Sequence, residues 1–137
     1  LAERGIAVAA ENVVHGGFTR DGGHATMQDL LARGVEADCV LAVNDVMAVG
    51  AMAALREHGI ELPQQMGVAG FDDIETLRDV TPALTTVRVP LEEIGTAALS
   101  LVILPRAEEP RLRRIPGRVV LRESTPGPGG PEAATGG

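Results

Sequence analysis

Two short polar clusters in this chain each follow an apolar run, and they hold the side chains best suited to chemistry. Asn44 and Asp45 end the first run, and Asp72 and Asp73 follow Phe71 at the end of the second. A carboxylate accepts hydrogen bonds from hydroxyl groups, whereas an amide both donates and accepts them. We therefore expect a site for a small polar ligand, with Asn44, Asp45, Phe71 and Asp72 as its binding residues.

Other roles stay open for the same carboxylates. Asp45 can serve as a helix N-cap, and Asp73 can cap the turn that follows it. Three aspartates could also hold Mg²⁺, but phosphoryl-accepting acidic pockets pair their acids with a lysine, and the chain has no lysine. Paired carboxylates could cleave a glycoside, although Phe71 is the only aromatic residue near them.

Composition excludes several classes of protein. The chain has 137 residues, a net charge of -7, twelve basic residues that are all arginine, and one cysteine, Cys39. The negative charge argues against binding of nucleic acid by this chain alone. The absence of lysine removes Schiff-base and Walker-type phosphate chemistry. A single cysteine excludes an internal disulfide, and we expect it to be a small buried residue of a strand.

The remaining polar residues give weaker signals. The three histidines are scattered without the spacing of metal ligands, and we expect no metal and no cofactor. Ser100 and Ser124 lack the surroundings of a hydrolase nucleophile, so we do not expect an enzyme. The arginines of 111–114 are expected to form a solvated loop face, with a DNA-binding patch as the lesser alternative.

Hydrophobic periodicity predicts alternating strands and helices. Strands are expected at 38–43, 67–71, 85–89 and 118–122, with short β-like pieces at 6–14. Helices are expected at 21–33, at 46–58 and from 91 to just before Pro105, with a short helical piece at 74–79. This order is typical of an α/β fold with a parallel sheet. In open sheets of this kind ligands bind outside the carboxyl ends of the strands, where both polar clusters fall.

The two ends of the chain lack the pattern of complete elements. Residues 1–4 followed by Gly5 resemble the last turn of a helix, which suggests a fragment of a longer protein. Residues 124–137 carry no apolar periodicity, so we expect a disordered tail there. No apolar run approaches the roughly 18 residues of a membrane helix, and we expect no membrane partner.

Several stretches form a pattern that is more specific together than singly. They are GFT at 17–19, AVNDVMAVGA at 42–51, VAGFDD at 68–73, TPALTTV at 81–87 and REST at 122–125. In this order and spacing they resemble the LacI/GalR family of bacterial transcriptional regulators. The resemblance extends over about residues 1 to 125.

The resemblance implies a sensor of the periplasmic-binding-protein type I fold, a three-layer α/β/α arrangement of two lobes, present here only as its C-terminal half. Residues 1–89 would form most of the C-terminal lobe, and 90–118 would form the return helix and connection of the N-terminal lobe. Residues 119–123 would form the final crossover strand before the tail. The helix-turn-helix DNA-binding domain would lie outside this chain.

The function that the resemblance implies is sensing of a small effector, such as a sugar, by a cytoplasmic regulator that binds operator DNA only through its helix-turn-helix. In the family, the residues matching Asn44 and Asp72 face the effector. The helix at 46–58 is apolar almost all round, and the resemblance places a homodimer interface on it and near Val80. The residues expected there are Met47, Val49, Ala53 and Val80. A periplasmic sugar-binding protein of an ABC transporter is the alternative.

Overall fold

The computed structural model describes residue 5 and residues 7–105 and 111–127 of the chain. Its helices are α1 (Arg20–Ala32), α2 (Asp45–Glu57) and α3 (Leu91–Ile103), and its strands are β1 (Cys39–Leu41), β2 (Gly67–Ala69), β3 (Thr86–Arg88) and β4 (Arg118–Val120). Two short 3-10 helices lie at Ala10–Asn12 and Glu75–Leu77. The helices and strands thus fall where the periodicity predicts them, whereas 7–14 contain a 3-10 turn in place of the expected β-like pieces.

The first two helices begin and end at residues whose chemistry accounts for their positions. The Thr19 hydroxyl accepts a hydrogen bond from the Gly22 amide at 3.0 Å, and Asn44 caps α2 by accepting one from the Met47 amide at 2.8 Å. Both residues have extended backbone, as N-caps do. Beyond the helix ends, Gly34 and Gly59 take positive φ values of 68° and 71°. Glycine reaches this conformation without steric cost.

Parallel pairing joins the strands that precede the polar clusters, as the sequence predicts. Val40 is in register with Val68, and isolated parallel bridges join Ala69 to Thr85 and Asp72 to Arg88. The segments at 39–41, 67–72 and 85–88 therefore run side by side in one direction. The pairing of β3 with β4 is antiparallel, because the chain reverses direction after α3. The predicted parallel sheet is thus confirmed for β1, β2 and the segment at 85–88, while β4 pairs antiparallel to β3.

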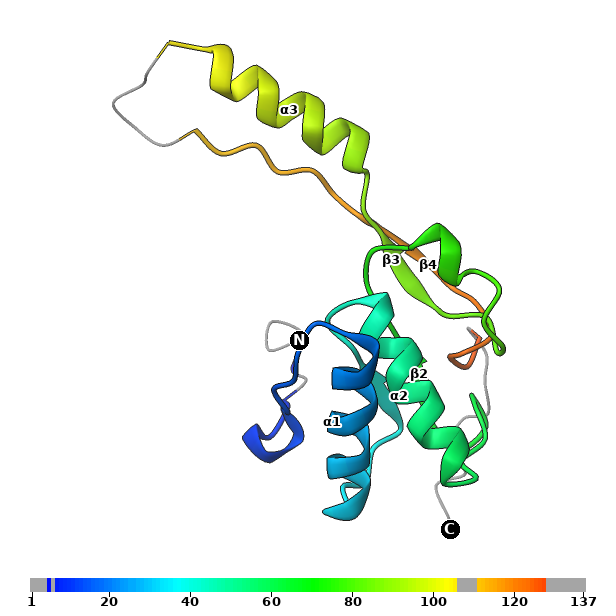
Figure 1. Cartoon of the computed structure of the whole chain (residues 1–137). Coiled ribbons are helices and arrows are strands. Elements are labelled where there is room, and N and C mark those ends of the chain that lie inside the picture. The colour runs from blue at the N-terminus through cyan, green and yellow to red at the C-terminus, as the bar shows by residue number, and fades with distance from the viewer. Residues whose placement is uncertain (1–4, 6, 106–110, 128–137) are drawn as a thin grey trace.

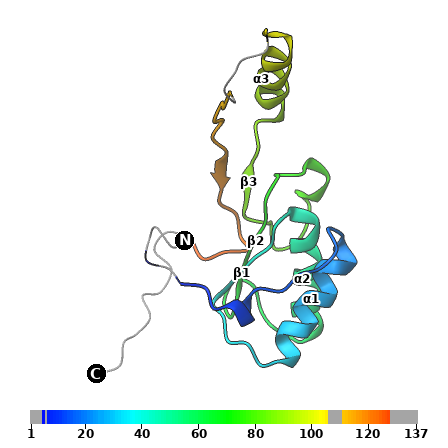
Figure 2. The ribbon, with the colours of Figure 1, turned by 90° about the vertical axis from the view of Figure 1, so that its left-hand side faces the viewer.

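The core lies between α2 and the sheet, and α1 packs against α2 (Figures 1 and 2). Its buried residues include Met27 of α1, Ala48 and Leu55 of α2, Val68 of β2 and Leu84. Helix α2 is apolar on nearly every side because it is covered from two directions. Only one helical layer, formed by α1 and α2, covers this sheet within the described residues (Figure 2).

This packing corrects two expectations about apolar residues. Met47 and Ala53 are 8% and 3% exposed within the single chain, so their apolar character needs no partner subunit. Val49 is only partly buried and packs against the core cluster, as does Val80. Conversely, Cys39 of β1 is exposed, where a buried residue was expected.

Helix α3 stands apart from the body formed by α1, α2 and the parallel strands (Figure 1). The β3–β4 ladder forms the connection, with β3 leading into α3 and β4 returning from it (Figures 1 and 2). Of the residues in α3 only Ala97 is buried, and Leu99 and Val102 are 64% and 79% exposed. The assignment of 1–89 and 90–118 to two different lobes remains a prediction.

The prediction places the start of the disordered tail too early, at residue 124. Ser124 is fully buried, and its hydroxyl donates to the Val68 carbonyl at 2.6 Å and accepts from the Thr85 amide at 2.8 Å. Its backbone also bonds to Val68 and Ala83. Residues 124–127 therefore belong to the folded body near β2, and the rest of the predicted tail, 128–137, lies outside the described residues.

None of the described helices has the length and apolar character that crossing a membrane requires.

Gly50 in α2 and Gly95 in α3 offer a matched test of the α1–α2 packing. A Cβ at Gly50 would overlap the Arg20 carbonyl oxygen of α1, whereas a Cβ at Gly95 meets no atom within 4 Å. We predict that Gly50→Ala lowers the free energy of unfolding by about 1–3 kcal/mol, because α1 must move away. Gly95→Ala should raise the free energy of unfolding by about 0.5–1 kcal/mol through helix propensity. Urea unfolding of this chain, followed by circular dichroism, measures both, and shifts of the same sign would contradict the packing.

Candidate functional site

The two polar clusters meet at the carboxyl end of the parallel strands. Backbone hydrogen bonds join the Ala42 amide to the Ala69 carbonyl and the Asp45 amide to the Phe71 carbonyl, each at 2.8 Å. Asn44 and Asp72 are the residues next to this second bond. The structure therefore brings together the two clusters that lie 28 residues apart in the sequence, on one rim of the sheet.

Asn44 and Asp72 present complementary groups at this rim. The Asn44 side-chain oxygen is used by the α2 cap, which leaves its NH₂ group as a donor. The Asp72 side chain is exposed, and no ion pair of the described residues includes it. Partial burial, and secondarily the nearby Asp45 carboxylate, raise the pKa of Asp72 above its ordinary 3.8. The rim thus offers one donor and one carboxylate acceptor.

Phe71 adds an apolar surface next to these groups, because this residue is 43% exposed. A site that combines a few placed polar groups with an apolar surface is typical of small-molecule binding. Two hollows of about 510 and 440 Å³ lie elsewhere in the described residues, and neither is lined by Asn44, Phe71 or Asp72. Within the described residues the rim is therefore an open surface and lies outside both hollows.

Asp45 lies beneath the rim, which gives it a structural role in place of the predicted ligand-binding one. Its side chain is buried, and both of its oxygens accept hydrogen bonds from the protein. One oxygen accepts from the Thr86 hydroxyl at 2.5 Å, and the other accepts from the Ile74 amide at 2.9 Å. The helix N-cap is Asn44, so neither of the roles considered for Asp45 from the sequence describes its position.

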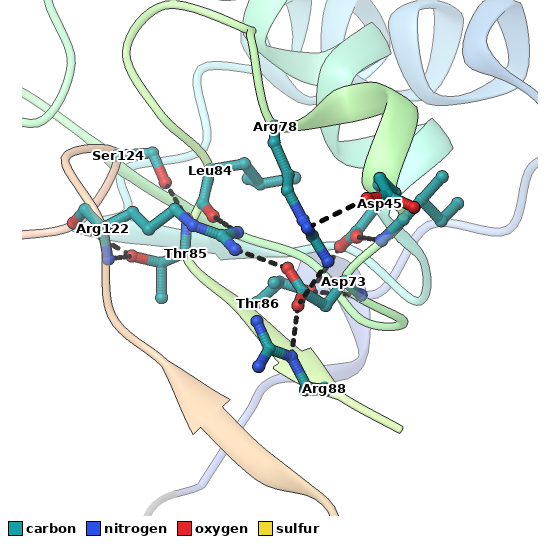
Figure 3. A network of polar contacts seen from close by, with 11 residues as sticks. Asp45, Asp73, Arg78, Leu84, Thr85, Thr86, Arg88, Arg122 and Ser124 are labelled. Carbon is teal, nitrogen blue, oxygen red and sulfur yellow. Dashed lines mark hydrogen bonds and ion pairs between the residues drawn. The ribbon is translucent and has the colours of Figure 1, made fainter. Parts of the chain in front are cut away.

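Asp73 is buried in the same way, at the centre of a cluster of arginines (Figure 3). Its side chain is 1% exposed, and its two oxygens accept hydrogen bonds from Arg122 Nη2 and Arg88 Nε, both at 2.5 Å. Arg78 Nη2 lies 3.6 Å away. Burial alone would raise the pKa of Asp73, but the hydrogen bonds and charges of Arg122 and Arg88 outweigh it and hold the pKa below 3.8.

The sequence gives no separate signal for Arg88 and Arg122, which belong to this cluster. Each follows a short run rich in β-branched residues and could equally be a solvated strand residue. Their partner, Asp73, is far away in the sequence, and only the strand pairing brings the three together. The one available hint is the doubled aspartate directly after a buried strand, because a carboxylate that becomes buried there needs a partner.

The described residues contain no group of three or more histidine, cysteine or carboxylate side chains that could hold a metal ion. His24 instead forms a 2.8 Å contact between its Nε2 atom and Glu57, which joins α1 to α2. His58 bonds to the Ala54 carbonyl of its own helix. His24 therefore links α1 to α2, and His58 caps the C-terminus of α2.

The chain is similar in sequence to a family of binding domains and to several transcriptional regulators. A family model described as the periplasmic binding protein-like domain matches residues 1–125. The transcriptional regulator GalR of Escherichia coli is 42% identical over 103 residues, which cover 75% of this chain and 30% of that protein. The repressor PurR of Erwinia tasmaniensis is 38% identical over the same shares of the two chains.

Among solved structures, a sugar-binding LacI-family regulator from Escherichia coli, complexed with phosphate, matches with a TM-score of 0.78 and 34% identity over 90% of this chain and 45% of that chain. A LacI-family regulator from Enterococcus faecium with bound ribose matches with a TM-score of 0.67 and 31% identity over 80% of this chain and 41% of that one. The chain therefore spans less than half the length of these relatives.

The buried position of Asp73 predicts a specific dependence on pH. Its carboxylate stabilises the fold fully above its unfolded pKa of about 3.8, and this contribution is lost as the pH falls through the lower folded pKa. At pH 7 we predict that Asp73→Asn lowers the free energy of unfolding by about 2–4 kcal/mol, because two charged hydrogen bonds are weakened. The difference in free energy of unfolding between the variant and the wild type should become smaller below about pH 4.

The matched control is Asp29→Asn, which removes an exposed carboxylate that pairs with Arg33 at 3.3 Å on the surface of α1. Such a pair contributes at most about 0.5 kcal/mol. Urea unfolding of both variants at pH 7 and at lower pH values down to about 2.5 makes the comparison. An Asp73→Asn effect that stays constant over this range would contradict the assigned ion pairs.

Proposed function

This chain belongs to the periplasmic binding protein-like family that forms the sensor domain of LacI-type transcriptional regulators, and from this premise we propose that it senses a small polar effector, such as a sugar, at the rim formed by Asn44, Phe71 and Asp72. The observation that carries the proposal is the division of the acidic residues at this rim. Asp45 and Asp73 are fully used by protein donors, whereas the Asp72 carboxylate is exposed.

The chemical groups at the rim are suited to binding a polyol. A sugar ring has hydroxyl groups along its edge and C–H groups on its faces. The Asp72 carboxylate can accept hydrogen bonds from hydroxyls, the Asn44 NH₂ group can donate to a neighbouring oxygen, and Phe71 can cover an apolar face. Because a hydrogen bond to a charged group contributes about 1.5–3 kcal/mol, Asp72 is expected to carry a large share of the affinity.

We propose that the opposite wall of the site comes from the N-terminal lobe of the complete sensor. Residues 90–118 would be its contribution from this chain, joined to the C-terminal lobe through β3 and β4. An effector that contacts both lobes favours the closed arrangement, because a ligand shifts a conformational equilibrium by its difference in affinity for the two states. The two strands that cross between the lobes, β3 and β4, are called the crossing strands. They would transmit this change toward a DNA-binding domain.

The regulator is preferred over the periplasmic sugar-binding protein because the relatives matched here are transcriptional regulators. With a net charge of -7 this chain is not suited to hold DNA, so operator binding would depend on a helix-turn-helix domain of the complete regulator. That role implies a cytoplasmic protein. We further propose a homodimer in which Val49 and Val80 contribute to the interface, since both are apolar and partly accessible.

The effector proposal predicts a selective effect of Asp72→Ala in the complete regulator. Binding of a sugar effector should weaken about 10- to 100-fold, because a charged acceptor is lost, while the melting temperature of the unliganded protein stays the same. Isothermal titration with a panel of mono- and disaccharides, alongside thermal melting, measures both. DNA binding should persist without responding to the effector.

Asp79→Asn is the matched control, because Asp79 is another exposed carboxylate of the loop that follows Asp72. It should leave the affinity for the effector unchanged. Undiminished affinity in Asp72→Ala, with an unchanged melting temperature, would show that Asp72 is only a turn residue.

The homodimer proposal predicts that an added charge at Val49 or Val80 weakens assembly. Val49→Asp and Val80→Asp should each shift the complete regulator toward monomer at micromolar concentration, because an aspartate buried in an apolar interface is left without a partner. Sedimentation velocity measures the shift. Ala25→Asp places the same charge on an exposed position of α1 and should stay dimeric. Folded Val49 and Val80 variants that both stay dimeric would exclude this face.

A further inference from the structure

The turn that carries Asp72 has an unusual backbone. Asp72 and Asp73 are the two non-glycine residues with positive φ within the described part of the chain, at 114° and 56°. Side chains other than glycine disfavour this conformation, so two such residues in succession persist only where the surrounding structure holds them. The direction of the Asp72 carboxylate therefore depends on whatever fixes this turn.

The contacts that fix the turn come mainly from the strand segment beside it. The Asp72 amide donates to the Val87 carbonyl at 2.9 Å, and the Asp73 amide donates to the Thr86 hydroxyl at 3.3 Å. The carboxylate of Asp73 adds its two charged bonds to Arg88 and Arg122. Asp73 is thus the residue of the turn whose side chain is held from two directions, while the Asp72 side chain makes no ion pair of its own within the described residues.

The two arginines connect this turn to both strands that lead to and from α3. Arg88 is the last residue of β3, and Arg122 follows β4 by two residues. Arg122 is itself fixed, because its Nη1 atom donates to the Leu84 carbonyl and its amide donates to the Thr85 hydroxyl, each at 2.8 Å. One buried carboxylate therefore joins the rim to the outgoing and the returning strand (Figure 3).

We propose that Asp73 is a positioning residue, which aims the Asp72 carboxylate at the effector and couples effector contact at the rim to the two crossing strands. The coupling rests on the effector site proposed above. Because coupling between two sites is reciprocal, a contact that fixes the rim also fixes the strands, and loosening the strands weakens binding at the rim. Loss of the Asp73 charge should therefore uncouple the two.

Hydrogen–deuterium exchange of the complete regulator without effector tests the positioning role. In Asp73→Asn, amides in 70–77, 84–89 and 118–125 should exchange about 10- to 100-fold faster, because weakened charged bonds allow local opening. Amides of α1 and α2 should keep their rates. Glu75→Gln removes the exposed carboxylate that pairs with Arg78 at 3.4 Å in the same loop, and it should change none of these rates.

Titration with D-ribose, D-galactose and cellobiose tests the coupling. For a sugar that binds wild type, Asp73→Asn should lose about 10- to 100-fold in affinity, and the double variant Asp72→Asn/Asp73→Asn should bind no more weakly than Asp72→Asn alone. The bound sugar should slow exchange in 84–89 and 118–125 of wild type and leave these segments of Asp73→Asn unprotected.

The possible failures are distinguishable. Unchanged exchange in Asp73→Asn, or an equal increase throughout α1 and α2, would overturn the positioning role whether or not a sugar binds. Additive losses of affinity in the double variant would overturn the coupling. If none of the three sugars binds wild type, the choice of these sugars as effectors is contradicted, while the exchange of the unliganded protein still decides the role of Asp73.

Discussion

The carboxylate of Asp73, buried between the guanidinium groups of Arg88 and Arg122, is the interaction on which the functional end of this structure depends. A buried charge is tolerated only when it is paired, so the three residues must meet for the chain to reach this arrangement. Their meeting fixes the end of β3, the segment that follows β4, and the turn that carries Asp72. The position of Asp72 at the rim depends on that constraint, whereas Asn44 is held by its cap of α2.

Each polar cluster at the rim divides its two residues between the interior and the ligand side. In the first cluster Asp45 is buried beneath the rim and holds Thr86 and the turn at Ile74, while Asn44 keeps an NH₂ group for a partner. In the second cluster Asp73 is buried, while Asp72 is exposed. The backbone accounts for the division, because Asn44 is the extended N-cap and Asp45 the first residue of α2, while Asp72 and Asp73 both lie in the turn with positive φ.

Much of this arrangement could be predicted from the sequence, because it depends on local patterns. The periodicity around α2, the glycines beyond the helix ends and the apolar runs of β1 and β2 each act over a few residues. The meeting of Asn44 and Asp72 at one rim followed from the general geometry of parallel sheets. The motif resemblance pointed to the same family that the comparisons identify.

The sequence could not predict properties that depend on contacts between distant residues. Ser124 is an ordinary polar residue before a proline- and glycine-rich stretch, and only its bonds to Val68 and Thr85 make it part of the core. Met47 and Ala53 suggested an interface because the position of α1 over α2 was unknown. Asp45 and Asp72 look alike in the sequence, and only three-dimensional packing separates the buried carboxylate from the exposed one.

In the proposed sensor Asp72 and Asn44 contact the effector, while Asp45 and Asp73 stabilise the backbone around them. A crystal structure of the complete regulator with a bound sugar tests this most directly. We expect sugar oxygens within hydrogen-bond distance, about 3.2 Å or less, of the Asp72 carboxylate and the Asn44 NH₂ group. Asp73 should remain bonded to Arg88 and Arg122. A sugar that is bound through the Asp45 or Asp73 carboxylate, or away from the rim altogether, would contradict it.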